Sequence, residues 1–310
     1  MNLAPIGMSV YTRIEHFKLS IAALQNNRLA SESELYIYSD AASKKEDETL
    51  VQQVRDFAHS ITGFKAIYVT ERENNYGGVR NSWEAWKEVT KKKGFSVYLE
   101  DDIVTAPGFL TFINKALDFY KDDENIVSIT GYCPPINIPN EYGDDAFVLP
   151  RASGWGMGSF DRTVEIGSKR IDQQAFENIV DKKIFTVAGE DVLPMIEMEA
   201  NGKLNAGDVR CMYYQALNNI YTIYPRRSLV QNIGIDGSGT HCGKSEKFNH
   251  KALWDKTDGF VFAEGLLPDK SIMRANWKFR RMSARAKFVS AINGTLLDTI
   301  LRTIKRLFVS

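Results

Sequence analysis

The first hundred residues alternate between short apolar runs and stretches with helical spacing, and this alternation restricts the possible folds more than any other feature. Apolar runs occupy residues 5–11, 34–39, 65–70 and 95–99, and the intervening residues 14–29, 48–59 and 81–92 have helical spacing. Such alternation predicts parallel strands joined by helices that cover both faces of a sheet. In sheets of this kind, ligands bind beyond the carboxyl ends of the strands.

The second half of the chain is less regular. Its apolar spacing predicts helices over 107–120, 171–180 and 192–200, and strands over 125–130, 147–150 and 220–224. A loop rich in Pro, Asn and Asp covers 134–145, a glycine-rich segment covers 154–158, and a long glycine-rich loop covers 231–247. Long loops of this type often carry function. The expected fold class is therefore α/β, with a mixed, mostly parallel sheet flanked by helices.

The strongest chemical signal is the run VYLEDDIVTAPGF at 97–109, in which Glu100, Asp101 and Asp102 directly follow an apolar strand. Three acids in this position are costly unless a positive charge lies beside them. Hard divalent cations such as Mn²⁺ or Mg²⁺ bind carboxylate oxygens together with substrate phosphates. The run therefore predicts a metal site for a diphosphate; the alternative is a loop of solvated acids that caps the next helix.

Two further polar groups follow strands of the same predicted sheet. Asp40 ends the strand at 34–39, and the segment ENNYGGVRNSW at 73–83 separates the next strand from its helix. Glycines between a strand and a helix allow a ligand to approach the backbone closely. Taken alone, a Gly-Gly pair before a helix indicates only a turn. The segment does not match G-x-G-x-x-G, which argues against a dinucleotide fingerprint.

Two candidates for catalysis and metal binding lie in the second half. Glu190 and Asp191 precede a predicted helix, where carboxylates are favoured by the helix dipole, and they are also candidates for a general base. The segment NIGIDGSGTHCG at 232–243 contains His241, which is a candidate metal ligand, a phosphate contact or an ordinary loop histidine. Cys242 beside it is interpreted as a bystander thiol.

Composition excludes several classes of protein. Lys and Arg together number 39 and so do Asp and Glu, so no overall charge indicates a nucleic-acid partner. Three widely spaced cysteines, without metal-ligand spacing, favour reduced thiols in a cytosolic compartment. The first ten residues lack the pattern of a secretory signal, and no uncharged run is long enough to span a bilayer.

The charge is unevenly distributed along the chain. Ten basic residues between 270 and 310 face one acid, Asp298, so this segment carries +9 and the preceding 269 residues carry −9. Residues 288–308 place apolar side chains along one helical stripe. A basic amphipathic helix is a candidate for peripheral contact with a membrane surface. The alternative is a helix that packs on the acidic body or on a second subunit.

Taken together, these motifs resemble GT-A glycosyltransferases, and most closely the N-acetylglucosaminyltransferase I type. The likeness rests on the order of the motifs along the chain. The first half contains an Arg after the first strand, then Asp40, the Asn-Gly-Gly loop, and Glu-Asp-Asp followed by Ala-Pro and a Phe-rich helix. The second half contains Ser-Gly-Trp-Gly-Met at 153–157 and Glu-Asp at 190–191. It covers residues 4–245. The tryptophans that flank the acidic pair in that family are absent here.

The resemblance implies a role for each matching residue. Asp102 would bind Mn²⁺ (or Mg²⁺) as the last acid of a DXD-type motif, and Asp191, with Glu190 as the second choice, would supply the catalytic base. His241 is a further candidate metal ligand. The implied nucleotide-sugar contacts are Tyr11, Arg13, Asp40, Asn75, Gly77, Arg80, Glu100, Asp101, Trp155 and Gly156.

The expected function is that of a metal-dependent, inverting glycosyltransferase, a hexosyltransferase that moves a sugar from a nucleotide-sugar donor, with UDP favoured, to a glycan or lipid-linked glycan in surface polysaccharide assembly. Residues 1–130 would bind the donor, 131–268 the acceptor, and 269–310 would form the basic helical tail of a cytoplasmic protein that is peripheral on the inner membrane face. The alternatives are a sugar-nucleotide nucleotidyltransferase, disfavoured because no glycine- and Lys/Arg-rich phosphate loop follows the first strand, and a non-catalytic carbohydrate- or membrane-binding protein.

Overall fold

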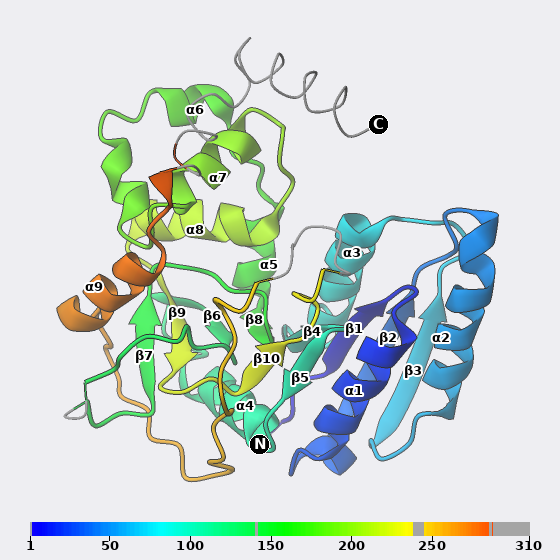
Figure 1. Cartoon of the computed structure of the whole chain (residues 1–310). Coiled ribbons are helices and arrows are strands. Elements are labelled where there is room, and N and C mark those ends of the chain that lie inside the picture. The colour runs from blue at the N-terminus through cyan, green and yellow to red at the C-terminus, as the bar shows by residue number, and fades with distance from the viewer. Residues whose placement is uncertain (1, 140–141, 238–244, 285–286, 288–310) are drawn as a thin grey trace.

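An eight-stranded sheet crosses the molecule in the computed structural model, which describes residues 2–139, 142–237, 245–284 and 287. The strand order is β3-β2-β1-β4-β8-β6-β9-β7 (Figure 1). Their bounds are β1 Ile6–Val10, β2 Glu34–Ser39, β3 Ala66–Glu71, β4 Phe95–Glu100, β6 Ile126–Thr130, β7 Ala146–Leu149, β8 Met157–Phe160 and β9 Tyr221–Pro225. Only β7 and β8 run against the others, so the sheet is mixed and mostly parallel, as the sequence predicts.

A smaller ribbon lies beside this sheet. After β4, the chain turns at Asp101 and Asp102 into β5 (Ile103–Thr105), which pairs antiparallel with β10 (Val230–Asn232). This pairing brings the start of the predicted 231–247 loop directly beside the acidic turn. The turn is thus framed by segments more than 120 residues apart in the chain.

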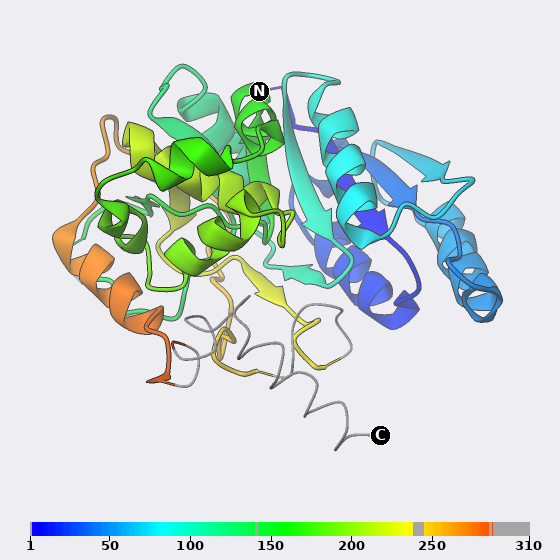
Figure 2. The ribbon, with the colours of Figure 1, turned by 90° about the horizontal axis from the view of Figure 1, so that it is seen from above.

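Helices cover both faces of the sheet (Figure 2). One face carries α1, α2 and α4, and α3 and α5 pack on the other, with α8 behind α5. The helix bounds are α1 Ile14–Gln25, α2 Glu48–Ser60, α3 Gly78–Thr90, α4 Phe109–Phe119, α5 Asp161–Ser168, α6 Gln173–Glu177, α7 Val192–Ala200, α8 Gly207–Asn218 and α9 Lys270–Phe279; short 3-10 turns lie at Ala30–Glu32, Lys45–Asp47 and Lys182–Thr186.

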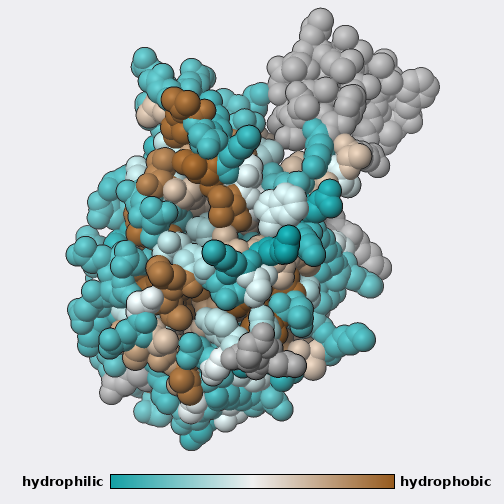
Figure 3. Space-filling model, turned by 90° about the vertical axis from the view of Figure 1, so that its left-hand side faces the viewer, coloured by the Kyte–Doolittle hydropathy of each residue, from teal (hydrophilic) through white to brown (hydrophobic). Residues whose placement is uncertain are grey.

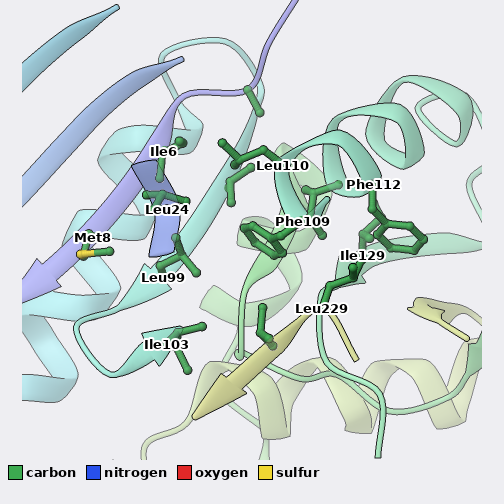
Figure 4. Packing of buried hydrophobic residues seen from close by; sticks show 14 of the residues in the cluster. Ile6, Met8, Leu24, Leu99, Ile103, Phe109, Leu110, Phe112, Ile129 and Leu229 are labelled. Atoms are coloured by element: carbon green, nitrogen blue, oxygen red, sulfur yellow. The ribbon is translucent and has the colours of Figure 1, made fainter. Parts of the chain in front are cut away.

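The main core lies between the sheet and the first group of helices. Ile6, Met8 and Leu99 from the strands meet Leu24 of α1 and Phe109 of α4, all of them fully buried (Figure 4). Burial of apolar surface on this scale is the chief stabilising contribution to a fold of this size. The core continues directly to the end of β4, so the acidic turn that follows β4 is held on a rigid base.

The sequence prediction is confirmed for the first half and is incomplete for the second. The strands and helices predicted before residue 130 are all present, with ends shifted by a few residues; α1 ends at Gln25 instead of 29. The helix predicted over 171–180 is wrong in length, because only Gln173–Glu177 is helical. The prediction missed β5, β8, β10, α5 and α8.

The basic segment after residue 269 is described only in part. Helix α9 packs against the body through Ile272, which is fully buried among Cys133, Phe147, Leu149 and Tyr224. This agrees with the packed alternative for residues 270–279. The predicted amphipathic stripe at 288–308 lies outside the described residues.

Candidate active site

The acidic turn owes its position to β4. This strand is buried between β1 and β8 and ends with Glu100, so the next two residues emerge at the edge of the sheet. The turn is fixed through its backbone: the Ser20 hydroxyl donates to the Asp101 carbonyl oxygen at 2.8 Å, and the Ile233 N–H donates to the Asp102 carbonyl oxygen at 2.9 Å. Asp101 and Asp102 are only 5% and 6% exposed.

Arg13 is the cation that faces these acids. Its Nη2 forms an ion pair with Asp101, and its Nη1 lies 2.9 Å from Oδ2 of Asp102. The second carboxylate oxygen of Asp102, Oδ1, is buried and has no hydrogen-bond partner among the described residues. A buried carboxylate oxygen without a partner is costly, and a bound cation would remove that cost.

The electrostatics of the turn agree with an unmet need for positive charge. Burial, with the charges of Asp102 and Asp101, raises the pKa of Glu100 to about 8. Burial raises the pKa of Asp101 to about 6, although Arg13 acts in the opposite direction. One guanidinium therefore does not compensate three acids at this point.

The donor set fits a hard divalent ion that shares its coordination with a ligand. Among the described residues, no three His, Cys, Asp or Glu side chains converge as a complete set of metal ligands. Asp102, with Asp101 beside it, supplies carboxylate oxygens, and such ions commonly complete their shell with water and phosphate oxygens. His241 lies outside the described residues.

Gly234 leaves the space in front of Asp102. A Cβ at this position would lie 2.1 Å from Oδ2 of Asp102 and 2.8 Å from Nη1 of Arg13. The glycine-rich loop therefore approaches the acids at a distance that no other residue permits. The described part of this loop therefore lies directly against the acidic turn.

Asp40 and Asn75 meet at the ends of β2 and β3. Asp40 accepts hydrogen bonds from the Tyr76 N–H at 2.8 Å and from Nδ2 of Asn75 at 3.3 Å. Gly77, with φ of +74°, then turns the chain into α3, a conformation that favours glycine. The Arg80 guanidinium lies 4.0 Å from the centre of the Tyr76 ring. The predicted loop residues are thus brought together at one sheet edge.

Tyr11 lies directly after β1, two residues before Arg13 in the chain. Its hydroxyl donates to Oδ2 of Asp47 at 2.7 Å and accepts from the Ser43 N–H at 2.9 Å. Tyr11 thereby ties the loop after Asp40 to the end of β1. Tyr76, from the predicted 73–83 segment, completes this group together with Ser43 and Asp47, which no sequence motif marked.

Trp155 and Gly156 lie at the start of β8. The Trp155 ring packs edge-on against Tyr132, with ring centres 4.7 Å apart, and against Phe248 at 5.8 Å. Gly156 has φ of +63°, and a Cβ there would lie 2.8 Å from the Phe109 ring. The glycine is therefore required by backbone conformation and packing, and it presents Trp155 beside the aromatic cluster.

Glu190 and Asp191 point to different partners. Asp191 accepts from Nη1 and Nη2 of Arg151 at 3.0 and 2.8 Å, and its side chain is 30% exposed. Glu190 accepts from the Met282 N–H at 2.9 Å and pairs with Lys287. These two contacts, the Met282 N–H first, lower the pKa of Glu190.

Arg151 is the cation that pairs with Asp191. Its guanidinium is almost completely buried, and Asp191 raises its pKa against the effect of burial, with a smaller contribution from Asp208. Asp208 also contributes, after burial and the neighbouring acids, to the raised pKa of Glu100. Arg151 carried no motif; its only sequence signal is a lone arginine directly after an apolar strand.

Within the described residues, no helix combines the length and hydrophobicity that a membrane span requires.

Comparisons with known proteins give only distant likenesses. No protein-family model and no curated protein matches the chain. Among solved structures, TarS 1–349 of S. aureus in complex with UDP is 12% identical, with a TM-score of 0.39; the match covers 74% of this chain and 60% of that one. A mannosyltransferase of Pyrobaculum calidifontis in complex with GDP-Man and Mn²⁺ is 12% identical, with a TM-score of 0.38, covering 63% of this chain and 52% of that one. A longer TarS structure is 11% identical with a TM-score of 0.37, and the match covers 73% of this chain and 36% of that one.

Proposed function

We propose that the chain is a metal-dependent, inverting glycosyltransferase of the GT-A kind, organised like the N-acetylglucosaminyltransferase I type. It would transfer a hexose from a nucleotide-sugar donor, with UDP favoured, to a hydroxyl of a glycan or glycolipid. The observation that carries this proposal is the buried acidic turn: two aspartates held by Arg13 at the tip of a parallel strand, with one Asp102 oxygen left without a partner.

The donor would lie along the sheet edge from Asp40 to Asp102. Asp40, Asn75 and Tyr11 frame the outer end, where the nucleoside would bind, and Arg13 lies at the inner end beside the acids. Asp102 would hold a divalent cation together with the donor diphosphate. When bound, such an ion neutralises the negative charge that develops on the departing nucleotide diphosphate.

Asp191 is the proposed base. An ionised carboxylate offers about four acceptor sites, so the two hydrogen bonds from Arg151 leave room for an acceptor hydroxyl. Arg151 would fix the orientation of the carboxylate, while Asp191 takes the proton as the acceptor oxygen attacks the anomeric carbon. The carbon–oxygen bond to the diphosphate breaks on the opposite face, which inverts the configuration.

The experiment that tests the donor site measures thermal stability with UDP or GDP, each with and without Mn²⁺. Wild-type protein should gain stability from one nucleotide only when Mn²⁺ is present, because a ligand that binds the folded form stabilises it. Asp102→Asn should lose this gain, and so should Gly234→Ala, whose Cβ would collide with the Asp102 carboxylate. Gly143→Ala is the matched control, because among the described residues beyond its chain neighbours no atom lies within 4 Å of the new Cβ.

Two results would contradict the proposal. If wild type binds the nucleotide as strongly in EDTA as with Mn²⁺, Arg13 alone neutralises the diphosphate and the site needs no metal. Full sugar transfer by Asp102→Asn would remove the acidic turn from the reaction altogether.

The choice of base has its own test. Asp191→Asn should bind nucleotide as wild type does but lose turnover, whereas Glu190→Gln should keep most of it. The reverse result would assign the base to Glu190. Peripheral contact with the inner membrane face through residues 269–310, and a role in surface polysaccharide assembly, complete the proposal; both rest on the charge of that segment and the expected lipid-linked acceptor.

A further inference from the structure

Three basic side chains gather around the turn that carries Asp191. A Cβ on Gly189 would lie 2.5 Å from Oδ1 of Asp191, 2.7 Å from Cβ of Arg280 and 3.1 Å from Nη1 of Arg151, so these three residues surround one point. Lys247 is the third cation, because its charge interacts with those of Arg280, Asp191 and Arg151. Arg280 arrives from the end of α9, more than 120 residues from Arg151.

The end of α9 is anchored on this turn by polar contacts. Nδ2 of Asn276 donates to the Ala188 carbonyl oxygen at 2.9 Å, and the Met282 N–H donates to Glu190 on the other side of Arg280. Nη1 of Arg151 reaches the same Ala188 oxygen at 3.3 Å. The position of Arg280 is therefore fixed by its neighbours in the chain and does not depend on an ion pair of its own.

Two aromatic rings, those of Phe248 and Phe279, pack against Arg280 and Lys247. The Arg280 guanidinium lies 5.3 and 5.1 Å from the ring centres of Phe248 and Phe279, and Nζ of Lys247 lies 5.7 and 5.0 Å from the same two centres. Phe248 also contacts Trp155, which contacts Tyr132. Arg280 and Lys247 therefore lie against an aromatic surface formed by Phe248 and Phe279, which continues to Trp155.

Among the residues that the structure describes, carboxylates do not match the positive charge at this turn. In the described part of the chain, neither Arg280 nor Lys247 has an ion-pair partner; Asp191 is bound by Arg151, and Glu190 is bound by Lys287. Nε of Arg280 and the hydroxyl of Tyr132, which is 1% exposed, are buried without a hydrogen-bond partner in that part. Burial, with the charge of Arg151, lowers the pKa of Arg280 to about 10. Burial, with Arg280 next, lowers the pKa of Lys247.

We propose that Arg280 and Lys247, beside Arg151, bind a phosphate group carried by the acceptor. Three cations face the carboxylate of Asp191, with a smaller contribution from Asp208 at Arg151, so positive charge is in excess here, as the binding of a phosphomonoester requires. Guanidinium groups bind phosphate in a bidentate manner and stack on aromatic faces, and Arg280 already lies against two aromatic rings. The proposal deepens the proposed function and rests on it for one point, the assignment of the anion to the acceptor, because the donor diphosphate would lie at Asp102 and Asp191 would face the acceptor.

The test compares binding of three probes at constant ionic strength by calorimetry: glucose 1-phosphate, glucuronate, and UDP with Mn²⁺. Removing a charged hydrogen-bond donor should weaken glucose 1-phosphate binding about tenfold or more in Arg280→Gln and in Lys247→Gln. Binding of UDP with Mn²⁺ should stay within about twofold of wild type, since those contacts lie elsewhere. Arg280→Lys should recover part of the loss. Arg274→Gln, an exposed arginine of the same helix, is the matched control.

Three outcomes would contradict the proposed phosphate site. Unchanged glucose 1-phosphate binding in Arg280→Gln and Lys247→Gln would leave the cations without this ligand. A parallel loss of UDP binding would assign them to the donor diphosphate. Tighter Arg280-dependent binding of glucuronate would assign them to a carboxylate. If wild type binds no nucleotide, the proposed function fails, while the Arg280 dependence of glucose 1-phosphate binding still decides whether the phosphate site exists.

Discussion

His250 shows how one residue joins the glycine-rich loop to the body. Its Nε2 donates to the Cys133 carbonyl oxygen at 2.7 Å, and its backbone N–H donates to Oε1 of Gln231 at 2.9 Å. Its ring also lies against Tyr132, one of the residues near the proposed phosphate site. Burial lowers the pKa of His250, against the effect of the bond to Cys133.

This shift predicts a loss of stability on the acid side of neutrality. A histidine whose pKa is lower in the folded state takes up a proton first when unfolded, so stability falls as the pH drops below about 6.5, the ordinary histidine value. The fall continues to the lower pKa of the folded form. Urea unfolding at several pH values from 7.5 to 5 should show a shallower fall in His250→Gln than in wild type.

His59→Gln serves as the control, because His59 is exposed on the far edge of the sheet beside Glu71. An identical slope in His250→Gln would show that other groups control the acid side.

At the residue scale, the sequence predicts functional side chains where they directly follow one apolar strand. Glu100, Asp101 and Asp102 stand out because an apolar run ends in three acids, and the structure places them at a buried strand tip. Arg13 was expected near the nucleotide, and it lies on the acids themselves. Arg151, Arg280 and Lys247 belong to no motif, because the partners that give each of them a role lie far away in the chain.

At the scale of elements, α9 is the part that most directly links stability to the proposed phosphate site. Its N-cap residue, Asp269, accepts hydrogen bonds from the Ser271 and Ile272 N–H groups at 2.8 and 3.0 Å. Ile272 anchors the helix in the body, and Arg280 follows its last turn. The cap therefore holds in place the helix that presents Arg280.

Asp269→Ala should cost about 1 kcal/mol of stability, the usual cost of losing an N-cap. It should also weaken glucose 1-phosphate binding, because a frayed α9 presents Arg280 less often. Asp172→Ala removes the corresponding cap of α6 and should lower stability without changing that affinity. Equal affinity in both variants would show that α9 is held by Ile272 and Asn276 alone. Chemical unfolding and calorimetry measure the two effects.

The missed elements have a common cause. Strand β8 was interpreted as part of a glycine-rich segment, yet Gly158 is required there because a Cβ would lie 2.8 Å from Ile113 of α4. Helix α8 buries Arg210, whose Nε pairs with the fully buried Glu199 of α7 at 2.7 Å, so its buried face is not apolar in sequence. Both elements depend on partners that no local pattern reveals.

At the scale of the whole molecule, the basic residues are concentrated at the C-terminal end of the chain. On the face that carries α9, apolar residues stand among hydrophilic ones (Figure 3). A groove on this side is lined by Pro135, Ile136 and Phe279 and bordered by Lys270, Arg274 and Lys278. Since residues 270–310 carry +9 against −9 on the rest, this end of the chain is the one an anionic surface would attract.

The full chain should therefore sediment with vesicles that contain anionic lipid but not with neutral vesicles, and salt should release it. Each basic residue near the surface contributes about 1 kcal/mol, so Arg302, Lys305 and Arg306 changed together to Gln should lose most of the binding. The same change at Lys18, Lys121 and Lys203, which are exposed on the body, is the control. If both triple variants lose vesicle binding equally, the binding depends on the net charge of the protein and not on the C-terminal segment.

The sequence by itself determined the alternation of strands and helices in the first half and the placement of three acids at a strand end, because both depend on patterns within a few residues. Only the tertiary structure decided that Arg13 faces those acids, that Arg151 holds Asp191, and that α9 brings Arg280 to the same turn. These contacts join residues 40 to 91 positions apart, and their geometry depends on how the whole sheet and its helices pack.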